Sequence, residues 1–122
     1  MDILLIEGDG AVAESLVDFL DLTSNHNFTR AGDRSETQDA LQKAYDLIIF
    51  EPYGCLEMHA PRDEIARTIR DASTPVFIST IYSRAILRSG FGLEPKHYNA
   101  VFIKPYRFPT LEKAINRLEE QR

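Results

Sequence analysis

The sequence predicts an α/β domain in which five parallel strands form a sheet covered by helices on both faces. Short apolar runs rich in Ile, Val and Phe recur along the chain, and each has the length of a buried strand. Amphipathic stretches lie between these runs, and this alternation is typical of βαβ units. The predicted strands are residues 3–6, 28–31, 47–50, 76–79 and 100–103.

The helices are predicted from apolar residues that recur every three or four positions. Pro61 and Pro109 stand where helices could begin, because a proline in the first turn forfeits no helical hydrogen bond. The fourth helix, over residues 83–89, has the weakest pattern, and the Gly-rich stretch at 90–92 is predicted to be mobile. The positions that carry the helical spacing are Val12, Leu16, Phe19 and Leu20; Ala40, Leu41 and Ala44; Ile65 and Ile69; and Leu111, Ala114, Ile115 and Leu118.

Size and composition favour a single domain over residues 1–122. A chain of 122 residues can bury its own core, and 43% hydrophobic residues is average for a globular protein. The net charge of −5 argues against a nucleic-acid binder, which needs clustered Lys and Arg. The chain opens with no basic segment or long apolar run, so neither export nor a membrane anchor is expected. Cys55 alone offers no disulfide framework, and we expect a cytoplasmic protein.

Polar residues follow four of the five predicted strands. In a doubly wound (βα)5 sheet with its first strand central, ligands bind outside the carboxyl ends of the strands. Carboxylates, a hydroxyl and an ammonium at one edge could hold a divalent cation and a phosphoryl group, because hard oxygen ligands suit Mg²⁺ and cations neutralise phosphoryl oxygens. The residues at these strand ends are Glu7, Gly8 and Asp9; Glu51; Thr80; and Lys104 with Pro105.

Four sequence blocks resemble the response-regulator receiver domains of two-component systems, and the resemblance spans essentially the whole chain. It implies the flavodoxin-like fold of chemotaxis regulators, a three-layer (βα)5 sandwich with strand order 2-1-3-4-5. The separations of 44 residues from Glu7 to Glu51, 29 from Glu51 to Thr80 and 24 from Thr80 to Lys104 are close to those of the family, the last slightly long. The blocks are LLIEGD at 4–9, DLIIFE at 46–51, TPVFIST at 74–80 and VFIKP at 101–105.

The resemblance implies roles for three of the strand-end residues. Lys104 matches the lysine that bridges an acidic residue and the phosphoryl group, and Thr80 matches the hydroxyl that moves toward that group. Glu7 fills the first acidic position. The bond between Lys104 and Pro105 is expected to be cis, as in most relatives.

The chain departs from the receiver pattern at four positions of the phosphorylation switch. Glu51 stands where the phosphorylated Asp is expected, and its extra methylene displaces the carboxylate from the in-line position. Gly8 replaces the second acidic residue, so Mg²⁺ binding is predicted to be weak. Ile81 follows Thr80 where relatives carry Ala or Gly, and it is expected to narrow access to the pocket. Val101 replaces the aromatic residue whose rotamer reports phosphorylation, and together the changes predict a pseudo-receiver.

Two interpretations are open for each part of the acidic pocket. Glu51 could imitate phospho-Asp, or it could form a structural ion pair with Lys104 that no longer switches. We favour the ion pair, because a glutamate has less charge and fewer acceptor oxygens than a phosphoryl group. Glu7 and Asp9 could keep a residual cation site, but we favour Asp9 as the N-cap of the first helix. Pro52 biases Glu51 to an extended backbone.

Other side chains offer less specific signals. His26, His59 and His97 show no ligand spacing, and Cys55 adds only one further donor, so we predict surface histidines and no metal site. No catalytic motif is present, so we predict no catalytic residues and no enzyme activity. In receiver domains the fourth helix, fifth strand and fifth helix bind partners or a second copy, and aromatic residues there favour an interface. These residues are Tyr82, Tyr98, Tyr106 and Phe108, with Phe102 expected in the core.

The resulting hypothesis is a receiver-like signalling domain that acts as a protein-interaction module, with no cofactor. Its expected partner is a signalling protein such as a histidine kinase or an effector, and a homodimer is a further possibility. A second hypothesis is a receiver that still accepts a phosphoryl group from a histidine kinase, at Asp9 or Glu51. A third is a flavodoxin-like sensor whose emptied pocket binds a small ligand.

Overall fold

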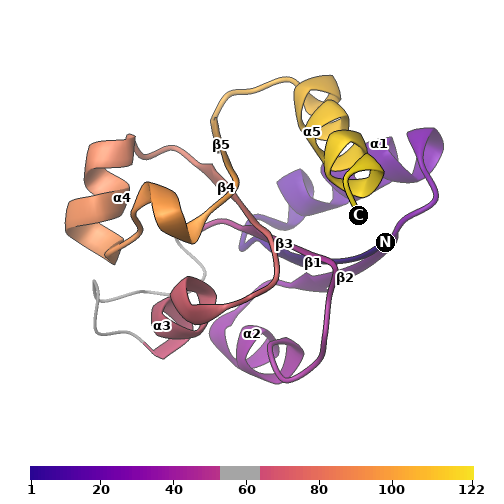
Figure 1. The fold of residues 1–122 in the computed structure, drawn as a ribbon. Helices are drawn as coiled ribbons and strands as arrows, with labels where there is room; N and C mark the ends of the chain where they lie inside the picture. The colour runs from indigo at the N-terminus through magenta and orange to yellow at the C-terminus, as the bar shows by residue number, and fades with distance from the viewer. Residues whose placement is uncertain (53–63) are drawn as a thin grey trace.

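A five-stranded parallel sheet forms the middle layer of a three-layer sandwich (Figure 1). The computed structural model describes residues 1–52 and 64–122. The strand order is β2-β1-β3-β4-β5, which confirms the predicted topology. The strands are β1 Asp2–Ile6, β2 Asn27–Ala31, β3 Leu47–Phe50, β4 Val76–Thr80 and β5 Ala100–Ile103. Ile6 pairs with Phe50, and Phe50 with Ile78, so the carboxyl ends of the central strands meet at one edge.

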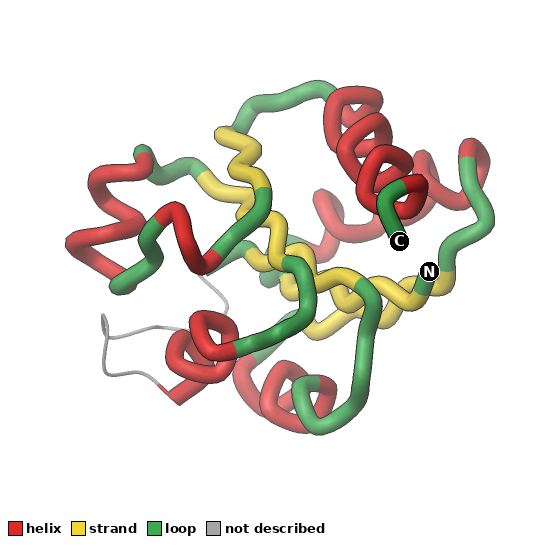
Figure 2. The backbone as a smooth tube through the Cα atoms, in the orientation of Figure 1, coloured by secondary structure: helices red, strands yellow, loops and turns green. Residues whose placement is uncertain are grey.

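Helices cover both faces of the sheet, and loops connect the strands to the helices beyond the ends of the strands (Figures 1 and 2). On one face lie α1 Gly10–Thr23 and α5 Phe108–Glu120, side by side. On the other face lie α2 Arg34–Ala40, α3 Glu64–Asp71 and α4 Arg84–Phe91. A short 3-10 helix, η2 Pro95–His97, precedes β5. No helix in the described part of the chain has the length and apolar character needed to cross a bilayer.

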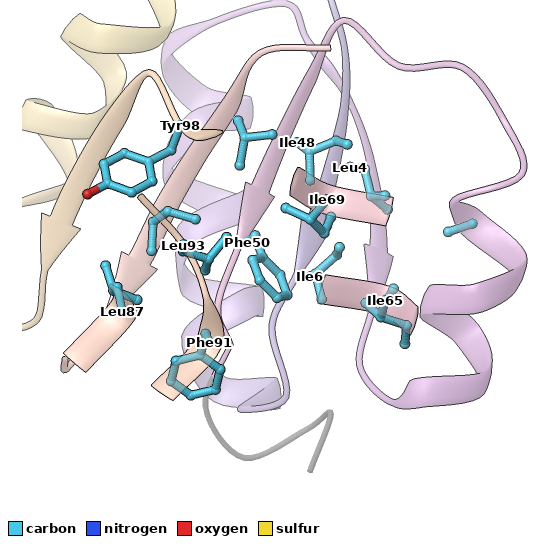
Figure 3. Packing of buried hydrophobic residues seen from close by; sticks show 14 residues of the cluster. Leu4, Ile6, Ile48, Phe50, Ile65, Ile69, Leu87, Phe91, Leu93 and Tyr98 are labelled. Carbon is cyan, nitrogen blue, oxygen red and sulfur yellow. The ribbon is translucent and has the colours of Figure 1, made fainter. Parts of the chain in front are cut away.

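The sheet separates two apolar clusters, because successive side chains of a strand point to opposite faces. One cluster packs against α1 and α5, and the other against α2, α3 and α4. Figure 3 shows the second cluster, where Phe50 and Ile6 face Ile65 and Ile69 of α3. Burial on both faces explains why the strands read as continuous apolar runs.

Helix α2 lies earlier in the chain than the apolar spacing predicted. It ends at Ala40, and Ala44 is exposed, so the prediction of a helix through Ala44 was wrong. Asp33 starts the helix by accepting the N–H of Glu36 at 2.8 Å, and the Glu36 carboxylate accepts the N–H of Gly32 at 2.9 Å. An acidic residue followed by Glu three positions later is a helix-start signal, and it outweighs the weak apolar pattern.

Helix α4 runs two residues beyond its predicted end. Ser83 caps its start by accepting the N–H of Ile86, and the helix continues through Gly90 because Phe91 is buried in the core. Gly92 ends it with a φ of 66°, a conformation that glycine adopts without steric cost. The predicted mobility of this stretch stays a prediction.

Two side chains predicted at the surface are buried. The His26 side chain is 3% exposed and lies edge-on to Phe28, so its prediction as a surface residue was wrong. Its Nδ1 lies 3.1 Å from the N-terminal nitrogen and its Nε2 3.4 Å from a Glu119 carboxylate oxygen. Tyr98 is 8% exposed and belongs to the core.

The predictions for Pro109, His97 and the segment before α3 have different outcomes. Pro109 lies in the first turn of α5, as predicted. His97 is half-buried, and its Nδ1 accepts the N–H of Glu94 at 2.9 Å. The predictions for Cys55, His59 and Pro61 lie outside the described residues.

Truncation of a fully buried side chain of α3 should strongly destabilise the fold. Ile69→Ala should lower the free energy of unfolding by about 2–5 kcal/mol, because the cavity adds to the lost burial. Ile86→Ala, at a side chain 45% exposed on α4, is the matched control and should change it by less than about 0.5 kcal/mol. Urea unfolding followed by circular dichroism measures both, and equal losses would contradict the assignment of the core.

Burial of His26 should make stability depend on pH. Burial and the nearby N-terminal ammonium lower the pKa of His26, although Glu119 opposes the shift. The unfolded chain then binds more protons than the folded one, so stability should fall as pH drops from about 6.5 toward the lower folded value. In His26→Gln this part of the pH dependence should be absent. Urea unfolding of both proteins at pH 7.5 and 5.0 measures it, and identical pH slopes would refute the prediction.

Candidate functional site

The strand ends bring together one ammonium and two buried carboxylates, which we call the Glu7–Lys104–Glu51 triad. Lys104 Nζ donates a hydrogen bond of 2.7 Å to Glu7 Oε1 and lies 3.6 Å from Glu51 Oε2. The Glu7 and Glu51 side chains are 5% and 3% exposed. The predicted ion pair of Glu51 with Lys104 is therefore present, and the shorter contact is to Glu7.

The Lys104 ammonium is stabilised in its charged form. Burial lowers the pKa of Lys104, but the hydrogen bond to Glu7 and the negative charges of Glu51 and Glu7 outweigh it, so the pKa lies above its ordinary value. A raised ammonium pKa stabilises the folded state below about pH 10.5, and this contribution is lost as pH rises through the folded value. Counted formally, one ammonium and two carboxylates give the triad a net charge of −1.

Backbone hydrogen bonds extend the sheet by one residue and so fix the triad. Each triad residue directly follows a strand and donates its N–H to a neighbouring strand. These bonds run from Glu7 to Ala31 at 3.1 Å, from Glu51 to Ile6 at 2.9 Å and from Lys104 to Thr80 at 2.7 Å. The Lys104–Pro105 peptide bond is cis, as the family resemblance implied.

The Asp9 side chain caps helix α1, while the Asp9 backbone N–H lies 3.4 Å from Glu7 Oε2. Its Oδ1 accepts the N–H groups of Ala11 at 3.0 Å and Val12 at 3.2 Å, which confirms the interpretation as an N-cap. Gly8 is exposed and brings no ligand. Among the described residues, no three His, Cys, Asp or Glu side chains lie together as a metal site. The two remaining carboxylates already share the Lys104 ammonium.

The three other switch positions have separate environments. Thr80 is fully buried, and its hydroxyl accepts the N–H of Tyr82 at 3.1 Å. Ile81 is 53% exposed beside it. Val101 is half-buried against the core on the α4 side of the sheet, as is Tyr82, whose ring lies 5.3 Å from that of Phe91.

Arg30 is a neighbour of the triad that the sequence did not indicate. It lies on β2, and its guanidinium donates a hydrogen bond of 3.1 Å to the backbone carbonyl of Glu7. A Cβ atom at position 32 would lie 2.7 Å from the Arg30 Nη2, so a side chain there would displace the guanidinium. An arginine two residues before a glycine at a strand end was the available signal.

Tyr106 connects the segment between β5 and α5 to β4. Its hydroxyl lies 2.7 Å from the Ser79 hydroxyl, and burial raises its pKa despite the Ser79 hydrogen bond and the charge of Lys104. The ring packs on Phe102 and Phe108 at centroid distances of 5.6 and 6.4 Å. Phe102 is buried, as predicted, whereas Tyr82, Tyr106 and Phe108 are half-buried.

Sequence comparisons find no family model and no curated protein that match the chain. Solved structures do match. A signal receiver domain of a two-component histidine kinase from Clostridium thermocellum has a TM-score of 0.76 and 21% identity, covering 96% of this chain and 95% of that chain. The chain has the receiver-domain fold. A two-component response regulator from Clostridium difficile gives a TM-score of 0.74 at 21% identity, covering 98% and 96% of the two chains. The chemotaxis response regulator CheY4 of Vibrio cholerae gives 0.71 at 21%, covering 96% and 97%.

Within the receiver fold, removal of the shared ammonium should destabilise the chain. Lys104→Met leaves two carboxylates close together in a buried site, and should lower the free energy of unfolding by about 3 kcal/mol at pH 7. Lys113→Met, at an exposed lysine of α5, is the matched control and should change it little. Urea unfolding measures both. Addition of Glu51→Gln to Lys104→Met should restore part of the loss, and equal effects of the two lysine variants would contradict the role of the triad.

Proposed function

We propose that the chain is a receiver-like signalling module that acts through protein contacts and is not switched by phosphorylation in the usual way. The observation that carries the proposal is the pairing of Lys104 with two buried carboxylates. A phosphoryl group brings about −1.5 to −2 charges, and the only ammonium of the triad is already outnumbered by carboxylates. Added negative charge would therefore meet repulsion.

Two further features support the same proposal. The Thr80 hydroxyl accepts the N–H of Tyr82, so one of its acceptor positions is used within its own loop. Gly8 supplies no carboxylate where Mg²⁺ would need one, and Mg²⁺ gives up its waters reluctantly. We accordingly propose weak Mg²⁺ binding and no independent catalysis, with Glu51 in a structural ion pair.

The proposed partner is a signalling protein, such as a histidine kinase or an effector, in the cytoplasm. Three of the four large apolar residues that are exposed in the described part of the chain, Ile81, Ile86 and Ile103, belong to β4–α4–β5. Exposed apolar side chains gathered on one side favour a contact surface. A homodimer through α4, β5 and α5 would use the same side.

Beryllofluoride with Mg²⁺ should leave the backbone NMR spectrum of the wild-type chain unchanged. The reagent mimics a phosphoryl group on a carboxylate, and the triad offers neither a free ammonium nor a metal site. Resonances of Glu7, Glu51, Thr80 and Lys104 report the site, and saturable shifts there would refute the proposal.

A double variant, Gly8→Asp with Glu51→Asp, is the positive control for this experiment. It restores the second acidic position and the shorter carboxylate, and we expect it to show Mg²⁺-dependent shifts at the same residues. An acid-labile band from the wild-type chain on a phosphate-affinity gel, after incubation with a histidine kinase and ATP, would instead support phosphotransfer.

A further inference from the structure

A groove with largely apolar walls lies beside the triad, between the start of α1 and the connection from β5 to α5. We call it the α1–α5 groove, and its volume is about 390 Å³. This volume falls within the range of roughly 300–1,000 Å³ typical of small-molecule sites. Helix α1 contributes Ala11, Val12 and Ser15, and the opposite wall contributes Lys104, Tyr106 and Phe108.

The groove is open because α1 presents small side chains to it. The aromatic wall of the groove is fixed by packing against other rings. Phe108 lies 5.7 Å from the Phe19 ring of α1, and Tyr106 lies 5.6 Å from the Phe102 ring of β5. The Tyr106 hydroxyl is paired with Ser79, so it needs no partner from a ligand. The wall is thus preorganised, which lowers the ordering cost of binding.

The charge next to the groove selects against anions. Among the described residues, Lys104 is the only charged one that lines it, and this ammonium is shared by Glu7 and Glu51. The net charge of −1 over these three groups repels a second negative group at short range, because their site is partly screened from water. The lining rings and aliphatic groups suit an aromatic or other apolar body.

We propose that the α1–α5 groove is a binding site for a small uncharged aromatic molecule. Lys104 belongs to both the groove and the triad, so an occupant alters the surroundings of the ammonium and is sensed at the strand ends. This inference goes beyond the proposed signalling role and requires only the groove and the triad charge. It makes the chain responsive to a neutral ligand where receiver chemistry expects a phosphoryl group.

The experiment is a titration of the full ¹⁵N-labelled chain with indole, and separately with indole-3-acetate. The two probes share a ring system and differ by one carboxylate. Indole should produce saturable shifts at Ala11, Val12, Ser15 and Tyr106, with smaller shifts at Lys104. The anion should bind about tenfold more weakly.

Variants that fill the groove make the test specific. Ser15→Trp should abolish the indole shifts, while Ser89→Trp, at an exposed serine of α4, should leave them intact. Ala11→Phe gives a second blocked groove if Ser15→Trp does not fold. Saturable shifts that persist in both blocked variants would overturn the location of the site. Absence of indole shifts in the wild type would overturn the proposal, and equal binding of both probes would overturn the charge argument.

The result is separable from that of the beryllofluoride experiment. Indole tests the groove on the α1 side, whereas beryllofluoride with Mg²⁺ tests the carboxylates. Absence of indole shifts would not contradict the signalling proposal. Shifts with beryllofluoride would not contradict the proposed ligand site in the groove.

Discussion

Burial of two carboxylates around one ammonium is the constraint on which this molecule depends. Charged groups that leave water are destabilising unless they are paired, and here three of them stand where parallel strands end. The topology makes the arrangement unavoidable, because β1 and β3 are neighbours and β5 reaches the same edge through β4. The ammonium therefore has a structural task that it would have to abandon in any switch, and loss of that task would leave an uncompensated negative charge.

The fold could be predicted because its signals are periodic and repeated. Five buried strands on a two-sided sheet produce five continuous apolar runs, and the observed strands match them to within one residue at each end. Helix α2 was misplaced because its start depends on Asp33 and Glu36, whose hydrogen bonds are local and carry no apolar pattern. Burial of His26 depends on Glu119 and the N-terminus, and no local sequence signal reports contacts between the two ends of a chain.

The residues of the site could be predicted from the sequence, but the distances between their side chains could not. Strand ends identify Glu7, Glu51 and Lys104, and the cap role of Asp9 follows from its position before an apolar helix. Which carboxylate lies closer to Lys104 depends on side-chain packing in three dimensions. The Ser79–Tyr106 pair joins β4 to the loop after β5, and sequence spacing does not specify a contact between two side chains 27 residues apart.

The distances from Lys104 to the two carboxylates bear on whether Glu51 imitates phospho-Asp. A mimic should attract the ammonium and the hydroxyl of the switch, since a phosphoryl group would engage both. Lys104 instead lies nearer to Glu7, at 2.7 Å against 3.6 Å, and the Thr80 hydroxyl accepts a backbone N–H in its own loop. Glu51 thus shares the cation with Glu7 and has the longer of the two contacts. That distribution favours a structural carboxylate, and it leaves the aliphatic part of Lys104 available to the groove beside α1.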